Sequence, residues 1–407
     1  MKLKAYKKSP ILDGAVQITG SKSESNRLLL LKALYGSFSI ENLSNSDDSE
    51  VMQRALASDQ KTIDVHHAGT AMRFLTAYFS IQQGRETILT GSNRMKERPI
   101  GLLVDALRGL GADITYMERE GYAPLHIKGC TFKNNRVDLQ ANVSSQYISA
   151  LMMIGGKLPD GIEINLLGEI TSVPYIKMTQ SLLEQLGINT RFENKTITVE
   201  HSTGLESEKL TVESDWSSAS YYYSLVALAE KASVNISSYK KESLQGDAVL
   251  EQIYKQLGVE TNYGESYMHL SKVKNFKSKH LKVDLVNSPD IAQTIVVTCF
   301  GLRIGCDLTG LHTLKIKETD RLEALKTELS KLGAKISVTK DSLHLEATTT
   351  INPEITIKTY QDHRMAMAFA PLALHVPIIF EDAEVVNKSY PDFWKDLEAL
   401  GFEIEKK

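Results

Sequence analysis

The chain has 407 residues, of which 42% are hydrophobic and 24% are charged, and its formal net charge is −3. This is the composition of a globular protein that is long enough for two domains with complete cores. The small net charge excludes an overall basic field for nucleic acid or anionic lipid, so any anion site must be local.

The sequence favours the cytoplasm. The three cysteines, Cys130, Cys299 and Cys306, do not suggest a disulfide framework, and the first residues, MKLKAYKKSP, lack the apolar core of a signal peptide. No apolar run reaches the roughly 18 residues that a membrane span needs. We therefore expect a soluble, cytoplasmic protein without a membrane partner.

The first strong helix signal is the stretch GSKSESNR, which leads into LLLLKAL. Ser21 and Glu24 have the spacing of a capping box. Lys22 and Arg27 are unexpected there, because a helix N-terminus carries partial positive charge. A bound phosphate would account for both cations, with Ser23 on the same helix face as Arg27. The alternative is that the stretch only caps the helix. It is not a Walker A loop, because a serine separates the glycine from the lysine.

A second pattern recurs along the chain: an amphipathic helix, then Leu-Gly, then a short strand. Glycine is expected after such a helix, because it adopts the left-handed conformation at little cost. The glycines stand about 70 residues apart, a longer period than in solenoids, at positions 111, 187, 258, 333 and 401. A degraded sixth copy without the glycine is SEVMQRALASDQ. We expect mixed α/β units, three in each of two domains, with the junction near TVESDWSSAS.

Cations also stand at later helix starts. Arg94 precedes a helix in SNRMKERPIGLLVDAL, Lys317 and Arg321 flank a Thr-Asp cap in KIKETDRLEAL, Arg364 opens QDHRMAMAF, and Lys388 lies in the turn before the last helix. Each alone could be a solvated or salt-bridged surface cation. Together they favour one polyanionic small-molecule ligand held by helix N-termini of two domains.

Two carboxylates, Asp290 and Glu318, lie within this basic set and could transfer protons at a site whose cations hold the substrate. The alternative for each is a helix cap or a salt bridge. Neutral polar residues at comparable helix starts could orient sugar-like hydroxyls, although this signal is weak; they are Ser144, Ser145, Gln146, Ser172 and Tyr175.

Other chemistries find no support. The sequence has no paired-cysteine or H-E-x-x-H metal signature, no G-x-S-x-G elbow and no G-x-G-x-x-G fingerprint. His66 and His67 are adjacent and on a strand would point to opposite faces, so we do not expect them to share a metal.

Seven motifs, in this order, resemble those of the 3-phosphoshikimate 1-carboxyvinyltransferase (EPSP synthase) family: GSKSESNRLLLLKAL, AGTAMRF, RMKERPIGLLVDAL, SSQYISALM, DWSSASYY, KETDRLEALKTEL and DHRMAMAF. The resemblance runs from residue 21 to about residue 395. It implies transfer of the enolpyruvyl group of phosphoenolpyruvate to the 5-hydroxyl of shikimate 3-phosphate, a step toward chorismate and the aromatic amino acids. It also implies that no metal or organic cofactor is used. We further expect a monomer that does not bind nucleic acid.

The fold that this resemblance implies is α/β: two similar inside-out α/β barrel domains, each of three βαβαββ repeats. The lobes would be residues 21–213 and residues 1–20 with 214–407. The stretch after SDDSEVMQRAL is shorter than is usual in the family, so we expect one repeat of the N-terminal lobe to be shortened.

The resemblance also implies roles for the motif residues. Asp290 would take the proton of the 5-hydroxyl, Glu318 would protonate the methylene carbon, and Lys22 would touch both substrates. Shikimate 3-phosphate would be held by Lys22, Ser23, Arg27, Ser144, Ser145, Gln146, Ser172, Tyr175, Asp290 and Lys317. Phosphoenolpyruvate would be surrounded by Lys22, Gly69, Arg94, Gln146, Arg321, Arg364 and Lys388. The anion that compensates Lys22 would then be the substrate.

Four positions depart from the family pattern. His66 and His67 replace Gly-Asn, Phe74 replaces a common proline, and Thr313 replaces an asparagine that contacts shikimate in many members. Two other functions stay open: UDP-N-acetylglucosamine enolpyruvyl transfer, although the chain lacks a cysteine in the SNRMKERPI loop, and non-catalytic binding of a phosphometabolite.

Overall fold

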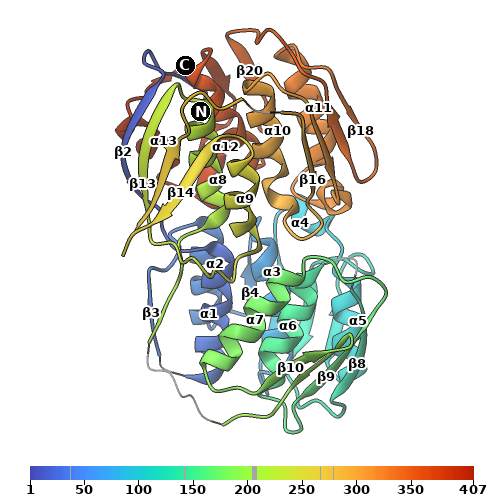
Figure 1. Ribbon diagram of the computed structural model, residues 1–407. Coiled ribbons are helices and arrows are strands. Elements are labelled where there is room, and N and C mark those ends of the chain that lie inside the picture. The colour runs from blue at the N-terminus through green and yellow to red at the C-terminus, as the bar shows by residue number, and fades with distance from the viewer. Residues whose placement is uncertain (37, 142–143, 204–208, 266, 278) are drawn as a thin grey trace. The chain divides into compact units, whose positions relative to one another are not determined.

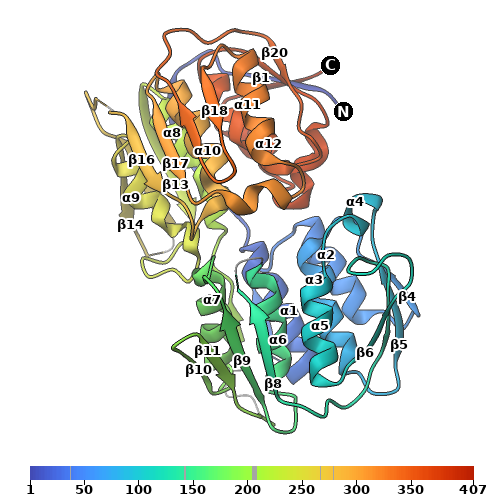
Figure 2. The same ribbon diagram turned by 90° about the vertical axis from the view of Figure 1, so that its right-hand side faces the viewer.

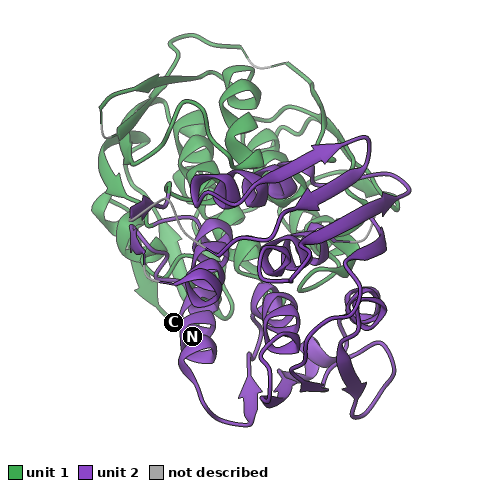
Figure 3. Ribbon diagram, turned by 90° about the horizontal axis from the view of Figure 1, so that it is seen from below, with its two compact units in different colours: residues 1–19, 213–407 green, residues 20–212 purple. Residues whose placement is uncertain are grey.

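The computed structural model describes residues 1–36, 38–141, 144–203, 209–265, 267–277 and 279–407. The chain forms two compact units: unit 1 contains Met1–Thr19 and Glu213–Lys407, and unit 2 contains Gly20–Val212 (Figure 3). Unit 2 is therefore an insertion in unit 1, between strand β2 (Ile11–Gln17) and helix α8 (Trp216–Leu228).

The described residues contain five copies of one arrangement: strand, helix, strand, helix and two further strands. The first two strands are parallel, and the fourth strand pairs antiparallel with both the second and the third, so each sheet has the order 1-2-4-3. The helix between the two parallel strands is the crossover that such a pair requires. This repetition confirms the βαβαββ units that were expected from the sequence.

Unit 2 holds two complete copies. The first consists of β4 (Thr62–Asp64), α3 (Gly69–Ser80), β5 (Glu86–Thr90), the short α4 (Asn93–Lys96), α5 (Gly101–Leu110), β6 (Asp113–Tyr116) and β7 (Leu125–Lys128). The second consists of β8 (Arg136–Gln140), α6 (Ser145–Gly155), β9 (Ile162–Leu167), α7 (Val173–Gln185), β10 (Thr190–Glu193) and β11 (Thr196–Val199).

A third, shorter copy in unit 2 has a sheet of only two described strands. It consists of α1 (Lys22–Tyr35), β3 (Ser39–Glu41), α2 (Asp47–Ala57) and β12 (Lys209–Thr211), and β12 runs parallel to β3. This is the shortened N-terminal repeat that the sequence predicted.

Unit 1 holds three copies. The first is β2, α8, β13 (Lys231–Ser237), the 3₁₀ turn η1 (Gly246–Val249), α9 (Leu250–Lys255), β14 (Val259–Tyr263) and β15 (Tyr267–Lys272). The second is β16 (Leu281–Asp284), η2 (Pro289–Ile291), α10 (Ala292–Gly301), β17 (Cys306–Thr309), η3 (His312–Ile316), α11 (Arg321–Lys331), β18 (Ile336–Val338) and β19 (Leu343–Leu345). The third is β20 (Ile355–Ile357), α12 (His363–Phe369), η4 (Ala370–Leu374), β21 (Ile378–Phe380), η5 (Ala383–Lys388), α13 (Phe393–Ala399) and β22 (Glu403–Lys406), with β1 (Leu3–Tyr6) as its fourth strand.

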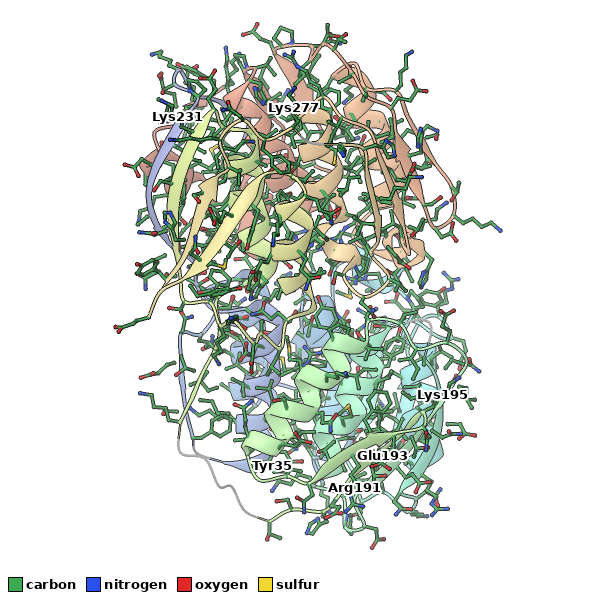
Figure 4. All side chains as sticks on the ribbon, viewed as in Figure 1. Tyr35, Arg191, Glu193, Lys195, Lys231 and Lys277 are labelled. Carbon is green, nitrogen blue, oxygen red and sulfur yellow. The ribbon has the colours of Figure 1, made fainter. Side chains whose placement is uncertain are left out.

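The first helix of most copies lies inside its unit, and the sheets lie outside (Figures 1 and 2). Every residue of α3, α10 and α12 is buried, as is typical of largely apolar core helices, although Arg73 in α3 and Arg364 in α12 are charged. The strands instead alternate: in β9, buried positions alternate with exposed or half-buried ones, as expected for a sheet with one face in water. On β10, Arg191 and Glu193 are exposed (Figure 4). Among the described residues, no helix is long and apolar enough to cross a membrane.

One of the five predicted glycines follows the end of the second helix of each complete copy within three residues. All five have positive φ: 115° at Gly111, 79° at Gly187, 81° at Gly258, 101° at Gly333 and 83° at Gly401. The degraded copy, α2, ends instead at Ser58 with φ −89°. The glycine is thus needed where the chain reverses directly into the third strand, and the shortened repeat can do without it.

Gly111→Ala should destabilise the protein by at least about 1 kcal/mol, because a side chain in the left-handed region costs roughly 1–2 kcal/mol. A Cβ there would also lie 3.1 Å from the backbone N of Lys133. Gly109→Ala, two residues earlier in the same helix and with open space around its Cβ, is the matched control and should be neutral or stabilising. Urea unfolding of both variants measures the difference; equal effects would contradict this explanation.

Candidate active site

In unit 1, the guanidinium group of Arg321 lies among three carboxylates. Arg321 is 2% exposed. Its Nη1 donates to Asp290 Oδ1 over 2.7 Å, and its Nη2 donates to Glu318 Oε2 over 2.9 Å. Its Nε donates to Asp362 Oδ2 over 2.7 Å. The structure therefore brings the two predicted proton-transfer residues together on one buried cation.

Helix starts position these groups. Asp320 caps α11 by accepting hydrogen bonds from the backbone N–H groups of Leu322 and Glu323, which confirms the predicted Thr-Asp cap and makes Arg321 the first helical residue. Asp362 caps α12 through the N–H of Arg364 while it also binds Arg321. One carboxylate thus serves as cap and as counter-ion.

Two further cations surround Asp290. Lys317 Nζ lies 3.4 Å from its Oδ1, and Arg364 Nη2 lies 3.6 Å from its Oδ2. Burial alone would raise the pKa of Asp290, but Lys317, Arg364 and Arg321 together lower it well below the usual range. Asp290 and Glu318 thus form salt bridges, which the sequence offered as the alternative to a role in proton transfer. Their partners are cations that were predicted to bind the substrates.

Lys388 joins the same part of unit 1 through the backbone. Its Nζ donates to the carbonyl oxygen of Gln361 over 2.7 Å. Gln361 directly precedes the cap residue Asp362 and has φ 55°. Five predicted residues of the C-terminal half therefore contact one another, and the sixth, Lys388, lies beside their helix start.

A carboxylate without a sequence signal, Asp247, lies near this cluster. It is 5% exposed and accepts a hydrogen bond from Ser217 Oγ, which itself accepts one from Arg364 Nη2 over 3.2 Å. Burial raises the pKa of Asp247 to about 6, although Arg364 opposes this shift.

In unit 2, Lys22 already has a protein counter-ion. Its Nζ lies 3.4 Å from Asp48 Oδ2 in the first turn of α2. Asp48 thus compensates part of the charge of Lys22, and the predicted contact of Lys22 with the substrates stays a prediction. The predicted capping box is wrong, because the Ser21 side chain makes no capping hydrogen bond to α1. Acids in the first turn of α2 are favoured by its dipole, so Asp48 serves both helices.

Arg27 is a buried cation with neutral partners. It is 2% exposed, and it donates to Thr179 Oγ1 over 2.8 Å, to Ser149 Oγ over 2.9 Å and to the carbonyl oxygen of Ser23 over 2.8 Å. It also lies over the ring of Tyr175. No carboxylate of the described residues lies within ion-pair distance of it. Burial lowers its pKa to about 10, although Tyr175 and the more distant Glu24 carboxylate oppose this shift. A desolvated cation of this kind favours an anion nearby.

The neutral candidates also lie at helix starts. Ser144 caps α6 by accepting from the N–H of Gln146, and Gln146 Nε2 donates to Thr70 Oγ1 over 3.2 Å. Gln146 is thus linked to the start of α3, where Gly69 is the first residue. Ser145 is buried within the first turn of α6.

Ser172 precedes α7 with φ 55° and ψ 40°, in the left-handed region. A non-glycine residue in this region is strained, and such residues gather at ligand sites. Tyr175, on the first turn of α7, contributes its carbonyl oxygen to Arg27 at 3.5 Å.

Two arginines lie in the segment that follows the strand next to Gly69. Arg94 forms a 2.9 Å ion pair with Glu97 in α4, and its contact with phosphoenolpyruvate stays a prediction. The side chain of Arg98, which the sequence interpretation did not assign, lies against Gly69, where an added Cβ would be only 2.6 Å from Arg98 Nη1. Gly69 thus leaves room for a guanidinium group at the start of α3.

The positions that depart from the family pattern also have defined environments. His67 Nδ1 lies 2.9 Å from Ser92 Oγ, the cap of α4, and His66 has φ 47°. Phe74 is fully buried in α3 and lies under Arg27. The Thr313 hydroxyl is buried without a hydrogen-bond partner among the described residues. Among all the residues that the structure describes, no group of three or more His, Cys, Asp or Glu side chains could hold a metal ion.

Comparison with known proteins assigns the class first. The fold matches the EPSP synthase of Acinetobacter baumannii with a TM-score of 0.81 at 20% identity, covering 100% of both chains. It matches the enolpyruvyl transferase NikO of Streptomyces tendae with a TM-score of 0.74 at 14% identity, covering 99% of this chain and 98% of that one. The architecture is thus that of the enolpyruvyl transferases, as expected.

The sequence comparisons identify one family within this class. The model of the EPSP synthase (3-phosphoshikimate 1-carboxyvinyltransferase) family matches residues 53–397. A 3-phosphoshikimate 1-carboxyvinyltransferase of Bacteroides fragilis is 45% identical over 97% of both chains, and one of Haemophilus influenzae is 35% identical over 96% of both. The chain therefore belongs to the EPSP synthase family.

Asp247→Asn should stabilise the protein at high pH. Since the pKa of Asp247 is raised from 3.8 to about 6, the folded chain holds a proton that the unfolded chain releases, and stability falls as pH rises through this interval. The neutral amide avoids this loss and still accepts from Ser217. We expect a gain of up to about 3 kcal/mol at pH 8, from roughly 1.4 kcal/mol per pKa unit, that shrinks toward zero near pH 4. Urea unfolding across this range measures it; a gain independent of pH would contradict the shift.

Proposed function

We propose that the protein transfers the enolpyruvyl (1-carboxyvinyl) group of phosphoenolpyruvate to the 5-hydroxyl of shikimate 3-phosphate and releases phosphate. The observation that carries the proposal is the pair of carboxylates, Asp290 and Glu318, held by one buried arginine between further cations. Membership of the family supports the same reaction, which serves the shikimate pathway to chorismate and the aromatic amino acids.

Unit 2 supplies most of the groups for shikimate 3-phosphate in this proposal. Arg27 is the strongest argument, because its charge is buried among neutral oxygen atoms and an anionic ligand would compensate it. The proposed ligands of shikimate 3-phosphate are Lys22, Ser23, Arg27, Ser144, Ser145, Gln146, Ser172, Tyr175, Asp290 and Lys317.

Phosphoenolpyruvate carries a phosphate and a carboxylate, so it requires several cations. Its proposed ligands are Lys22, Gly69, Arg94, Gln146, Arg321, Arg364 and Lys388. Arg321 already makes four hydrogen bonds to carboxylates. Its main contribution is therefore to fix Asp290 and Glu318, and any bond to the ligand is a smaller one.

The charges around Asp290 determine when it can act as a base. Three cations lower its pKa, and such a carboxylate is a weak base for a hydroxyl proton. When the anionic groups of the two substrates bind Lys317 and Arg364, these cations are compensated and the pKa of Asp290 rises. Proton transfer is thereby coupled to occupation by both substrates.

The reaction then proceeds by addition and elimination. Asp290 removes the proton of the 5-hydroxyl while the hydroxyl oxygen forms a bond to C2 of phosphoenolpyruvate. Glu318, after taking up a proton from solvent, delivers that proton to the methylene carbon. In the tetrahedral intermediate, the C2–phosphate oxygen bond breaks, the methyl group returns a proton to Glu318, and the departing phosphate takes the proton from Asp290. The products are the enolpyruvyl ether and phosphate.

We further propose that the two lobes are residues 21–213 and residues 1–20 with 214–407, that the protein acts as a monomer without nucleic acid, and that it works in the cytoplasm. The two compact units support the lobes. The three cysteines are free thiols, which supports a reducing compartment.

The decisive experiment measures phosphate release from phosphoenolpyruvate with shikimate 3-phosphate present, absent, or replaced by UDP-N-acetylglucosamine. Release that requires shikimate 3-phosphate is expected. Release with UDP-N-acetylglucosamine instead would assign the other acceptor, and binding of shikimate 3-phosphate without release would leave a binding protein.

Arg27→Met should weaken the binding of shikimate 3-phosphate by roughly 10- to 150-fold, the loss expected for a hydrogen bond to a charged group. Calorimetric titration measures the Kd. The exposed Arg191→Met in the same unit is the matched control and should bind as the wild type does. Unchanged affinity of the Arg27 variant would remove Arg27 from the site.

Glu318→Gln should lower kcat by about 10²- to 10⁴-fold, because general acid catalysis contributes on this scale, while the Kd of shikimate 3-phosphate changes little. Rapid-quench kinetics with saturating substrates provides kcat, and titration provides the affinity. Turnover close to that of the wild type would exclude Glu318 as the proton donor.

A further inference from the structure

Asp247, in the 3₁₀ turn η1, is a buried carboxylate with no role in the reaction described above. It is 5% exposed, and it makes no ion pair within 4 Å among the described residues. Its Oδ2 accepts a hydrogen bond from Ser217 Oγ, on the first turn of α8. Burying a carboxylate without a counter-ion is costly, whereas an asparagine could accept the same hydrogen bond.

The Ser217 hydroxyl connects this carboxylate to a cation of the site. A hydroxyl has one proton and two lone pairs. Since the proton is directed to Asp247, the lone pairs of Ser217 must accept from elsewhere, and Arg364 Nη2 donates to Ser217 Oγ over 3.2 Å. By taking the proton of the Ser217 hydroxyl, Asp247 leaves the lone pairs of Ser217 Oγ directed toward Arg364 as a hydrogen-bond acceptor.

The Arg364 guanidinium group is also attracted by the carboxylate of Asp290. The same Nη2 lies 3.6 Å from Asp290 Oδ2, which is longer than a hydrogen bond. If Ser217 no longer accepted, the guanidinium group could move closer to Asp290 and close this ion pair. Arg364 would then be less available to an anionic ligand, and Asp290 would be a still weaker base.

We propose that Asp247 is a positioning residue that, through Ser217, holds the Arg364 guanidinium group away from Asp290 and oriented for the anionic groups of phosphoenolpyruvate. The inference rests on the proposed function, which assigns Arg364 to that substrate. It adds an Asp247–Ser217–Arg364 relay within unit 1, whose members come from η1, α8 and α12.

The test combines kinetics and crystallography on the full-length protein. Ser217→Ala and Asp247→Ala should raise the KM of phosphoenolpyruvate about tenfold or more, the effect of losing one hydrogen bond to a charged group, and leave the KM of shikimate 3-phosphate within about twofold. Asp247→Asn retains the acceptor and should recover most of the loss. Ser224→Ala, also on α8, removes a buried hydroxyl that accepts from Thr298, and should behave as the wild type does.

Crystal structures of the same variants test the relay directly. In Ser217→Ala and Asp247→Ala, the Arg364 guanidinium group should move into hydrogen-bond distance of Asp290. A parallel rise of both KM values, or an Arg364 that keeps its position in both variants, would overturn the relay. If the wild type releases no phosphate with either acceptor, the proposed function fails, and the position of Arg364 in these structures still decides whether Asp247 and Ser217 orient it.

Discussion

A buried guanidinium group shared by three carboxylates is the interaction on which the rest of unit 1 depends. Arg321 is almost fully buried, and isolating its charge there would be strongly unfavourable without Asp290, Glu318 and Asp362. These partners precede or begin α10, α11 and α12. One arginine therefore fixes the starts of three helices from two neighbouring repeats, and its loss would leave three like charges facing one another. The chemistry and the local fold share the same ion pairs.

The sequence predicted those parts of the fold that depend on short-range geometry. A glycine that ends a helix must adopt the left-handed conformation whatever surrounds it, so five such glycines disclosed the repeat, and the copy without one proved to be the shortened repeat. The grouping of Lys317, Glu318 and Arg321 was predictable for the same reason, because these residues lie within five positions of one another at the start of a helix. The short sheet of β3 and β12 was also predictable, because the stretch after SDDSEVMQRAL is shorter than is usual in the family.

The contacts that the sequence did not predict join residues far apart in the chain. Lys22 pairs with Asp48 from the next helix, and nothing in the stretch around Lys22 specifies that helix as its neighbour. Ser21 had the right spacing for a cap, yet capping depends on a side-chain rotamer that spacing does not determine. Asp247 carries no motif signal, because its importance lies in burial and in a hydroxyl 30 residues earlier.

The insertion of unit 2 within unit 1 also constrains the order in which the chain can fold as the ribosome releases it. Residues 20–212 contain both partners of every strand pair of unit 2, so this unit can complete its sheets early. Strand β2 emerges before it, yet its partner β13 follows unit 2, and β1 pairs with β21 and β22 at the far end of the chain. Until those strands are made, β1 and β2 present unpaired backbone edges that could join another chain. Strands β1 and β2 thus stay exposed while unit 2 is synthesised, and their sheets in unit 1 are completed only when β13, β21 and β22 follow.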